Sequence, residues 1–136
     1  MSIREIKPED PARVAPEALS DGFAISSRHV APDMVMVEIA GDLDIATVPQ
    51  ADTFLTQAAA GRPRHLIIDL ARVEFLASSG LGFLLAARPD EDRNYARLHL
   101  LGVTQNRIVH RALAATALLE QFEIAEDLES LLAELH

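Results

Sequence analysis

The chain has 136 residues, of which 49% are hydrophobic and 24% charged, a balance typical of one folded domain with a real hydrophobic core. Its net charge of −9 disfavours nonspecific binding to nucleic acid, and the absence of cysteine excludes disulfides and thiolate metal sites. The chain contains no apolar signal core and no uninterrupted apolar stretch of about 18 residues, so we expect a cytoplasmic protein without membrane contact.

The N-terminal segment differs in composition from the rest of the chain. Residues 1–22 carry three prolines, Pro8, Pro11 and Pro16, and many charged side chains. We interpret this segment as an arm, or a short helix, outside the main core. Residues 23–136 are then expected to form a single domain.

An antiparallel hairpin is predicted at the start of that domain. Residues 23–30 form a weakly patterned strand, and residues 31–33 (Ala-Pro-Asp) supply turn residues. Residues 34–40 then alternate between apolar and other side chains, and Gly41 is expected to end this second strand. The side chains expected on one face of the second strand are Val35, Val37 and Ile39.

A helix is predicted to start at Thr47. Thr47 and Gln50 have the spacing of a capping box, and Pro49 falls in the first turn, where its missing N–H costs little. Residues 61–63 (Gly-Arg-Pro) are expected to end the helix. Its inward stripe is formed by Phe54, Leu55 and Ala58.

The central stretch of the chain combines a buried strand with a serine-rich helix start. Residues 65–70 are a short apolar run of the kind that fills a central strand, and a short loop separates them from Ser78, Ser79 and Gly80. Serine is a preferred N-cap, and the helix is expected to stop near Arg88. Its free N–H groups could hold a phosphate. From the residues alone, either a capping serine or a modified or catalytic serine fits this pattern.

The last third of the chain predicts two strands and two helices. Residues 98–101 read as a buried strand closed by Gly102, and Thr104 is expected to cap the following helix. Residues 122–124 form a short edge strand. The final helix carries an apolar stripe that either closes the core or forms a groove for a partner or a second copy, namely Leu128, Leu131, Leu132 and Leu135.

Alternation of strands and helices after the hairpin implies parallel pairing with right-handed crossovers. The predicted fold is therefore of the α/β class: a mixed sheet, antiparallel at the hairpin and parallel afterwards. The helices are expected to pack mainly on this sheet.

Enzyme chemistry finds little support in the sequence. The chain has one lysine, Lys7, and lacks a phosphate-binding loop of the Walker type, while Leu76 stands where a hydrolase nucleophile turn needs glycine. No pair of histidines has metal-site spacing, and His110 reads as an ordinary helical residue. We therefore expect no enzyme activity, no cofactor and no metal.

Two carboxylates precede the first helix, at Asp42 and Asp44. One interpretation is a polar turn that solvates the chain before a helix. The other is an acidic rim near Ser78, because loops after neighbouring strands gather at one end of a sheet. A phosphate on Ser78 would then be repelled by both carboxylates.

The order and spacing of these motifs resemble those of a known family. The stretch 34–60, with its Gly-acid-Leu-Asp turn, the Ser-Ser-Gly-Leu-Gly motif at 78–82 and the stretch 98–124 together look like a STAS domain of the anti-sigma factor antagonist type. The resemblance covers roughly residues 24–135. It implies a STAS-like mixed sheet, with Ser78 as the phosphoacceptor and Asp44 close by.

The resemblance also implies a mechanism. A bacterial anti-sigma factor antagonist binds an anti-sigma factor that is also an ATP-dependent serine kinase, and so frees a sigma factor. Phosphorylation at Ser78 would break that complex, and a phosphatase would restore it. The implied protein is a monomer or weak dimer, and its partner-binding surface comprises Asp42, Asp44, Ser79, Gly80 and Leu81.

The chain departs from the family pattern just before the phosphoacceptor, where Ala77 stands in place of the common aspartate. An alternative is therefore a STAS module that binds a protein or a small ligand without being phosphorylated. A third hypothesis, a small enzyme that uses Ser78, is opposed by the missing nucleophile turn, lysines and metal ligands.

Overall fold

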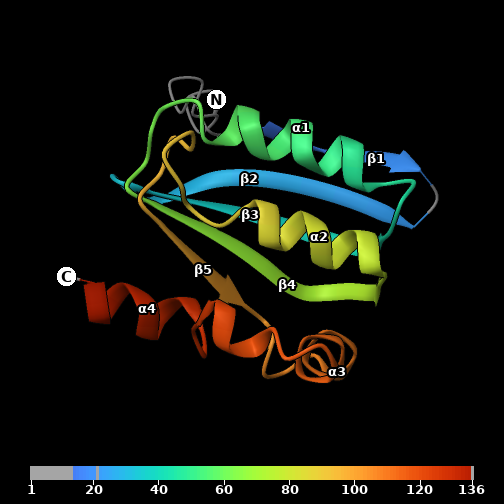
Figure 1. Ribbon diagram of the computed structural model, residues 1–136. Coiled ribbons are helices and arrows are strands. Elements are labelled where there is room, and N and C mark those ends of the chain that lie inside the picture. Colours follow the sequence, from blue (N-terminus) through green and yellow to red (C-terminus); the bar gives the residue numbers. More distant parts are fainter. Residues whose placement is uncertain (1–13, 21, 136) are drawn as a thin grey trace, which may run out of the picture.

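The computed structural model describes residues 14–20 and 22–135, and over these residues the chain forms one six-stranded sheet in the order β1-β2-β3-β4-β5-β6 (Figure 1). The strands are β1 (Val14–Ser20), β2 (Phe23–Ala31), β3 (Met34–Leu43), β4 (His65–Leu76), β5 (Arg97–Leu101) and β6 (Glu123–Ile124). The helices are α1 (Val48–Ala58), α2 (Ser78–Ala86), α3 (Arg107–Ala115) and α4 (Leu128–Leu135), and a 3-10 turn covers Leu119–Gln121.

The predicted pairing is confirmed. Strands β2 and β3 form the antiparallel hairpin, and β3 to β6 pair in parallel through helical crossovers. None of the helices in the described segments is both long and apolar enough to cross a membrane.

The first strand was not expected from the sequence. Val14–Ser20 pairs with β2 in antiparallel register, so this part of the predicted arm extends the sheet rather than forming a short helix. Residues 1–13 of the arm lie outside the described residues. The proline pattern of the segment misled the prediction because an edge strand tolerates Pro16, whose missing N–H can face away from the ladder.

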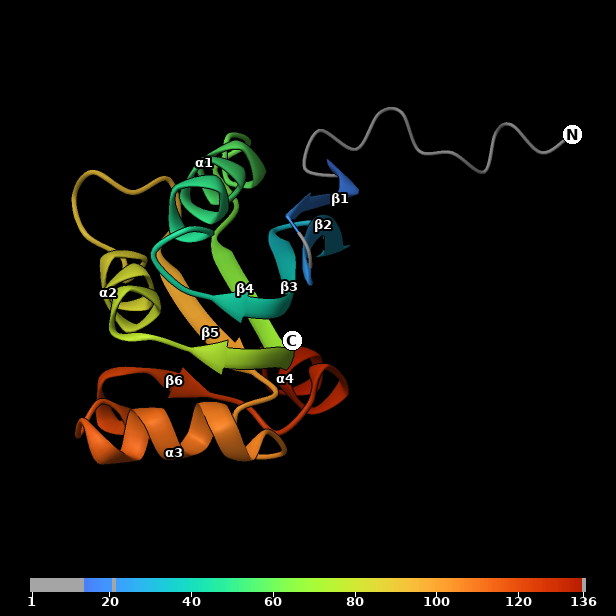
Figure 2. The same cartoon turned by 90° about the vertical axis from the view of Figure 1, so that its right-hand side faces the viewer.

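Helices cover both faces of the sheet (Figure 2). Helices α1 and α2 lie on one face above the main core, which also takes Val109 and Leu113 from α3. Helix α4 lies on the other face above a smaller apolar cluster. The first half of β3 is therefore buried on both sides, from Met34 to Val37, rather than on one face as its alternation predicted.

Two strands run further than predicted. The apolar run at His65 continues to Leu76, because β4 keeps pairing with β3 beyond two register shifts. Strand β3 likewise passes through Gly41 to Leu43. Gly41 has a φ of +97°, and a Cβ there would fall 1.4 Å from the carbonyl oxygen of Gly22, so glycine lets β3 continue past the start of β2 rather than ending the strand.

Two of the three predicted helix caps are wrong. Thr47 occupies the N-cap position of α1 as predicted, although it makes no side-chain cap bond, but Ala77, not a serine, occupies the N-cap of α2. Asn106, not Thr104, caps α3: its Oδ1 accepts from the N–H groups of Ile108 and Val109. Sequence spacing identified the helix starts to within a few residues, but tertiary contacts decided which side chain serves each end.

Candidate functional site

The loops that follow β3 and β4 meet at one edge of the sheet. In the parallel register Leu43 lies beside Leu76, and the next main-chain contact joins the loops themselves. The N–H of Ala77 donates a 3.1 Å hydrogen bond to the carbonyl oxygen of Leu43. The start of α2, with Ser78, is thereby held against the end of β3, which carries Asp42, and the turn after it, which carries Asp44. We call the segment 42–47 the Asp42 loop.

Gly80 makes this close approach possible. It is buried, and a Cβ at this position would lie 2.6 Å from the carbonyl oxygen of Leu43 and 2.7 Å from a methyl carbon of Leu76. Any side chain would push α2 away from the end of β3. The absence of a side chain at Gly80 therefore lets α2 pack against the end of β3 under the predicted partner-binding surface.

Gly82 differs from Gly80. It is exposed, and no heavy atom would lie within 4 Å of a Cβ added there. The outer surface of the first turns of α2 is therefore bare. Leu81 is half-buried against the main core, so only part of its side chain is available to a partner.

Ser78 and Ser79 occupy the first two positions of α2. Ser78 is exposed, whereas Ser79 is half-buried. Over the described part of the chain, the main-chain N–H groups of Ser78, Ser79 and Gly80 donate no hydrogen bond, and the helical ladder begins with Leu81 bonded to Ala77. Free N–H groups at a helix N-terminus favour an anion, so a phosphate on Ser78 would lie in a favourable local field.

The side chain of Asp44 organises the loop before α1. Its Oδ1 accepts hydrogen bonds from the N–H groups of Ala46 and Thr47, at 3.0 and 3.2 Å. The side chain of Thr47 adds two hydrogen bonds to the same turn: its hydroxyl accepts one from the Asp44 N–H and donates one to the carbonyl of Asp42. Asp44 is half-buried in this turn, while Asp42 is exposed. These bonds confirm the turn interpretation for Asp44, and the acidic rim near Ser78 stays a prediction.

Two large apolar side chains at this edge were missed by the sequence reasoning. Ile45 directly follows Asp44 and is 81% exposed, and Phe75 is 50% exposed on β4, where it pairs with Asp42. A branched apolar residue inside a polar turn was a signal that could have identified Ile45. For Phe75, only the longer course of β4 reveals that its side chain points away from the core.

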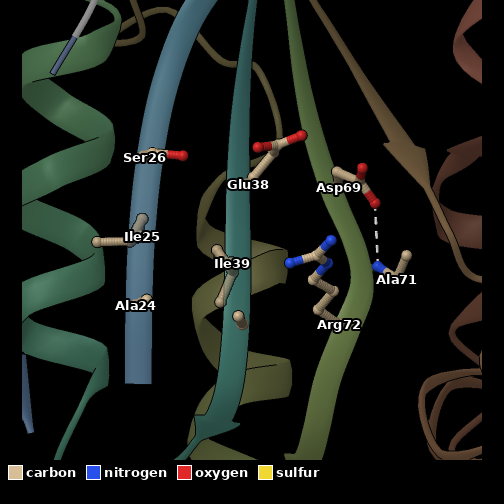
Figure 3. Close-up of a pocket in the computed structure, with 9 residues that line it drawn as sticks. Ala24, Ile25, Ser26, Glu38, Ile39, Asp69, Ala71 and Arg72 are labelled. Atoms are coloured by element: carbon tan, nitrogen blue, oxygen red, sulfur yellow. Dashed lines mark hydrogen bonds between the residues drawn. The ribbon is translucent and has the colours of Figure 1, made fainter. Parts of the chain in front are cut away.

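Other candidates for chemistry lie elsewhere or form no cluster. His110 is exposed on α3, and the described residues include no group of three or more potential metal ligands. A cavity of about 430 Å³ lies over β2, β3 and β4 (Figure 3). Its polar lining includes Glu38, Asp69 and Arg72, and Asp69 is bonded to the N–H of Ala71.

The family comparison covers most of the chain. A model of the STAS domain matches residues 27–131. This range includes the whole edge described above, from the Asp42 loop to the first turns of α2.

Two relatives similar in sequence are both named anti-sigma-B factor antagonist. The anti-sigma-B factor antagonist of Staphylococcus aureus (strain NCTC 8325 / PS 47) is 28% identical over 93 residues, covering 68% of this chain and 84% of that protein. The anti-sigma-B factor antagonist of Staphylococcus epidermidis is 27% identical over 97 residues, covering 71% and 88%.

Solved structures share the fold. An anti-sigma factor antagonist from Mycobacterium paratuberculosis superimposes with a TM-score of 0.62 at 25% sequence identity. The superposition covers 81% of this chain and 92% of that one. The predicted STAS-like mixed sheet is thus confirmed.

Proposed function

The chain belongs to the STAS domain family, and we propose that it is an anti-sigma factor antagonist whose partner docks on the edge formed by the Asp42 loop and the start of α2. The relatives named above carry that role in their names. In this proposal the protein acts by binding rather than by catalysis, in the cytoplasm of a bacterium, as a monomer or weak dimer.

The observation that carries the proposal is the surroundings of Ser78. An exposed hydroxyl stands at a helix N-terminus whose outer surface is bare at Gly82, with Ile45 and Phe75 exposed at the same edge of the sheet. Exposed large apolar side chains near an accessible backbone are typical of a protein-binding surface. A serine there is accessible to a partner kinase while the protein is free and is covered once a partner binds.

Phosphorylation at Ser78 would act through charge. A phosphate adds about −1.5 to −2 charge and would lie near the carboxylates of Asp42 and Asp44. The free N–H groups of α2 favour the phosphate in the free protein, whereas an apolar interface would have to desolvate it. Binding is then weakened without a change of fold, and an anti-sigma factor with serine kinase activity is the proposed partner, with a phosphatase reversing the step.

Ala77 bears directly on this proposal. The family commonly has an aspartate before the phosphoacceptor, and its side chain could hold the loop. In this chain the main-chain bond from Ala77 to Leu43 and the contact of Gly80 with Leu43 hold the loop instead. The position of Ser78 therefore does not depend on a carboxylate at residue 77, which supports phosphorylation despite the substitution.

The alternative is a STAS module that binds a protein without being phosphorylated, and Ala77 is the residue that favours it. A carboxylate there could also orient the Ser78 hydroxyl towards a kinase, and an alanine cannot. Kinase-dependent labelling of Ser78 separates the two functions.

The test uses Ser78→Asp with Ser78→Ala and Ser79→Ala as controls. Each purified variant is titrated against the anti-sigma factor encoded by the same organism, and kinase labelling with ATP is followed in parallel. We expect Ser78→Asp to weaken binding more than tenfold, Ser78→Ala to bind but resist labelling, and Ser79→Ala to behave as wild type.

Equal binding by wild type and Ser78→Asp would contradict the switch and leave the unphosphorylated module. No binding by any variant would contradict the anti-sigma factor assignment itself.

A further inference from the structure

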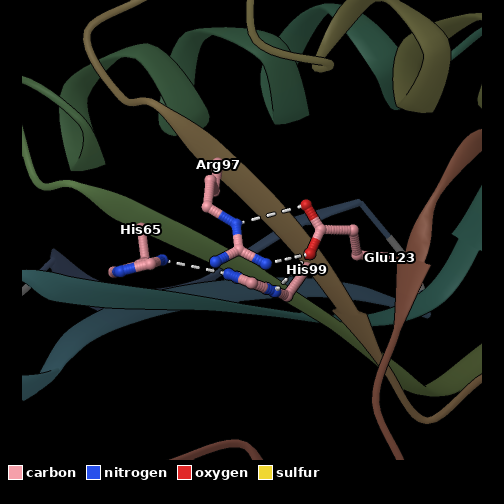
Figure 4. A network of polar contacts seen from close by, with 4 residues as sticks. All are labelled: His65, Arg97, His99 and Glu123. Carbon is pink, nitrogen blue, oxygen red and sulfur yellow. Dashed lines mark hydrogen bonds and ion pairs between the residues drawn. The ribbon is translucent and has the colours of Figure 1, made fainter. Parts of the chain in front are cut away.

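A buried histidine pair lies on the sheet face that α4 covers. His65 at the start of β4 and His99 in β5 are 6% and 2% exposed, and Nδ1 of His65 lies 3.1 Å from Nε2 of His99 (Figure 4). One of these two nitrogens must carry the proton that forms the hydrogen bond. Ser78 follows the far end of β4, so this pair is separate from the proposed partner site.

The pair is part of a network that reaches the edge of the sheet. Nδ1 of His99 lies 3.8 Å from Oε1 of Glu123 on β6, and Glu123 is held in a two-bond ion pair by Arg97. The carboxylate of Glu123 is thus already paired with the guanidinium of Arg97. Within this network, a protonated histidine would have no carboxylate that is not already paired.

Helix α4 lies over the same region. A cavity of about 400 Å³ opens between β5, β6 and α4, and its lining includes His99 together with Leu131, Glu134 and Leu135 of α4. Over the described residues, Leu131 is the one fully buried side chain of the helix. The other α4 leucines are only partly buried, on a cluster made of Met34, Met36, Ile67 and Leu101.

The attachment of α4 is therefore light compared with that of the helices on the main core. Helix α4 has eight residues and rests on a small apolar cluster, and His99 lines the cavity beside its side chains. A change of charge at His99 therefore acts on a lightly packed part of the described fold.

The surroundings of His65 and His99 disfavour the protonated form of both rings. Burial lowers the pKa of His99 to about 4 and also lowers the pKa of His65. Burial is the largest influence on both rings, and nearby arginines lower the pKa further: Arg97 for both rings and Arg64 for His65. Glu123 raises the pKa of both rings and Asp33 that of His65, but these effects are smaller. Because the rings are bonded to each other, they titrate as a pair.

A second added proton has a further effect. It places an N–H on both facing nitrogens, which removes the hydrogen bond and sets two cations side by side. A state in which α4 has moved away and the rings are hydrated takes up these protons at the ordinary pKa of histidine.

We propose that mild acidification releases α4 from the sheet, with the His65–His99 pair as the proton-sensitive element, and so uncovers the apolar face formed by Met34, Met36, Ile67 and Leu101. Between pH 7.5 and 5.5, uptake at His99 alone raises the equilibrium constant for opening about tenfold. The carboxylate that caps α4, Asp127, does not contribute in this range, because its bond to the N–H of Ser130 lowers its pKa from the ordinary value of 3.8.

Hydrogen exchange of the full chain tests the proposal. Amide exchange of α4 and of β4 is measured at pH 7.5, 6.5 and 5.5 and corrected for the intrinsic pH dependence of exchange. We expect the opening constant of the α4 amides to rise about tenfold and to stay well above that of the β4 amides from Leu66 to Leu70, which open only on global unfolding. Unchanged α4 protection, or an α4 opening constant equal to that of β4 at each pH, would overturn the proposal.

Variants separate the pair from other titrating groups. In His99→Gln the α4 opening constant should rise clearly less than in the wild type over this range, and the rise that remains comes from His65. In His110→Gln, which alters an exposed histidine on α3, the tenfold rise should persist. A tenfold rise that survives in His99→Gln would contradict the assignment.

A measurement on the wild type avoids any failure of the variant to fold. The imidazole carbon resonances of the buried histidines and the methyl resonance of Met34 are followed by NMR in a titration extended below pH 4, because the pKa of His99 is about 4 in the folded protein. A shared midpoint supports the release of α4 by the pair, and midpoints that differ by more than about one pH unit refute it.

Discussion

Gly80 lies against Leu43 so closely that a single added Cβ would fall 2.6 Å from the Leu43 carbonyl oxygen. The contact joins the two loops of the proposed partner site, because Leu43 stands between Asp42 and Asp44 and Gly80 follows Ser78 and Ser79. The site is therefore assembled through the backbone of a helix start and the backbone of a strand end. Side-chain chemistry is added on top of that contact.

We predict that Gly80→Ala destabilises the protein by about 1–3 kcal/mol, because the new methyl group meets backbone that cannot yield without moving α2. Gly82→Ala is the matched control two residues along the same helix. It has open space around its Cβ and should stabilise the protein by up to about 1 kcal/mol through helix propensity. Urea unfolding of both variants checks the pair, and equal effects would contradict the packing at Gly80.

Asp44 is expected to act on stability through its oxygen atoms rather than its charge. Asp44→Asn keeps an acceptor for the N–H groups of Ala46 and Thr47 and should change the free energy of unfolding by less than about 0.5 kcal/mol. Asp44→Ala leaves those groups without their side-chain partner and should cost about 1 kcal/mol. Thermal unfolding of the two variants distinguishes them, and a large loss in Asp44→Asn would show that the charge itself is needed.

Ile45 should matter for partner binding and not for folding. Its side chain is 81% exposed, so Ile45→Ser should alter stability by less than about 0.5 kcal/mol. If Ile45 anchors the proposed partner, the same change should weaken binding to the anti-sigma factor at least tenfold. Glu91→Ser, in the exposed loop beyond the other end of α2, serves as the control and should bind like wild type. Calorimetric titration measures both, and unchanged affinity in Ile45→Ser removes this residue from the interface.

Asn106 joins α3 to β4 and should be among the most sensitive polar positions. Its amide nitrogen donates to the carbonyls of Leu70 and Val73 at 2.9 and 2.8 Å, while its oxygen caps the helix. Asn106→Ala loses the cap and leaves strand carbonyls without a donor, so we expect a loss of about 2–4 kcal/mol. Thr104→Ala, at the exposed residue that spacing alone proposed as the cap, should change stability by less than about 0.5 kcal/mol. Urea unfolding of the two variants decides between the caps.

Global stability should fall on mild acidification. The pKa of His99 is about 4 in the folded protein and near 6.5 when unfolded, so below pH 6.5 the unfolded chain binds more protons. The free energy of unfolding should therefore drop by about 1 kcal/mol or more between pH 7.5 and 5.5. His65, whose pKa is also lowered by burial, acts in the same direction. Urea unfolding at several pH values measures the slope, which should be smaller in His99→Gln than in His110→Gln.

The order of strands and helices from the hairpin onwards could be predicted from apolar periodicity and turn residues. Apolar periodicity records which face of a segment is buried, and alternation of strands with helices leaves few ways to connect them. This sufficed for the mixed sheet, for the short edge strand at β6 and for the helix that begins at Ser78. The proximity of Ser78 to Asp44 also followed, because both residues come after neighbouring parallel strands.

The atoms that hold these elements together could not be predicted in this way, because they meet only in the folded chain. The cap of α3 is Asn106 because that side chain alone reaches both the helix start and the β4 carbonyls, a relationship between residues more than 30 positions apart. The exposure of Phe75 depends on how far β4 keeps its pairing. The contact of His65 with His99 depends on the pairing of β4 with β5. Such contacts join segments that are distant in the chain, and they stabilise the protein only once the sheet is assembled. Local propensity describes single segments and therefore cannot predict these contacts.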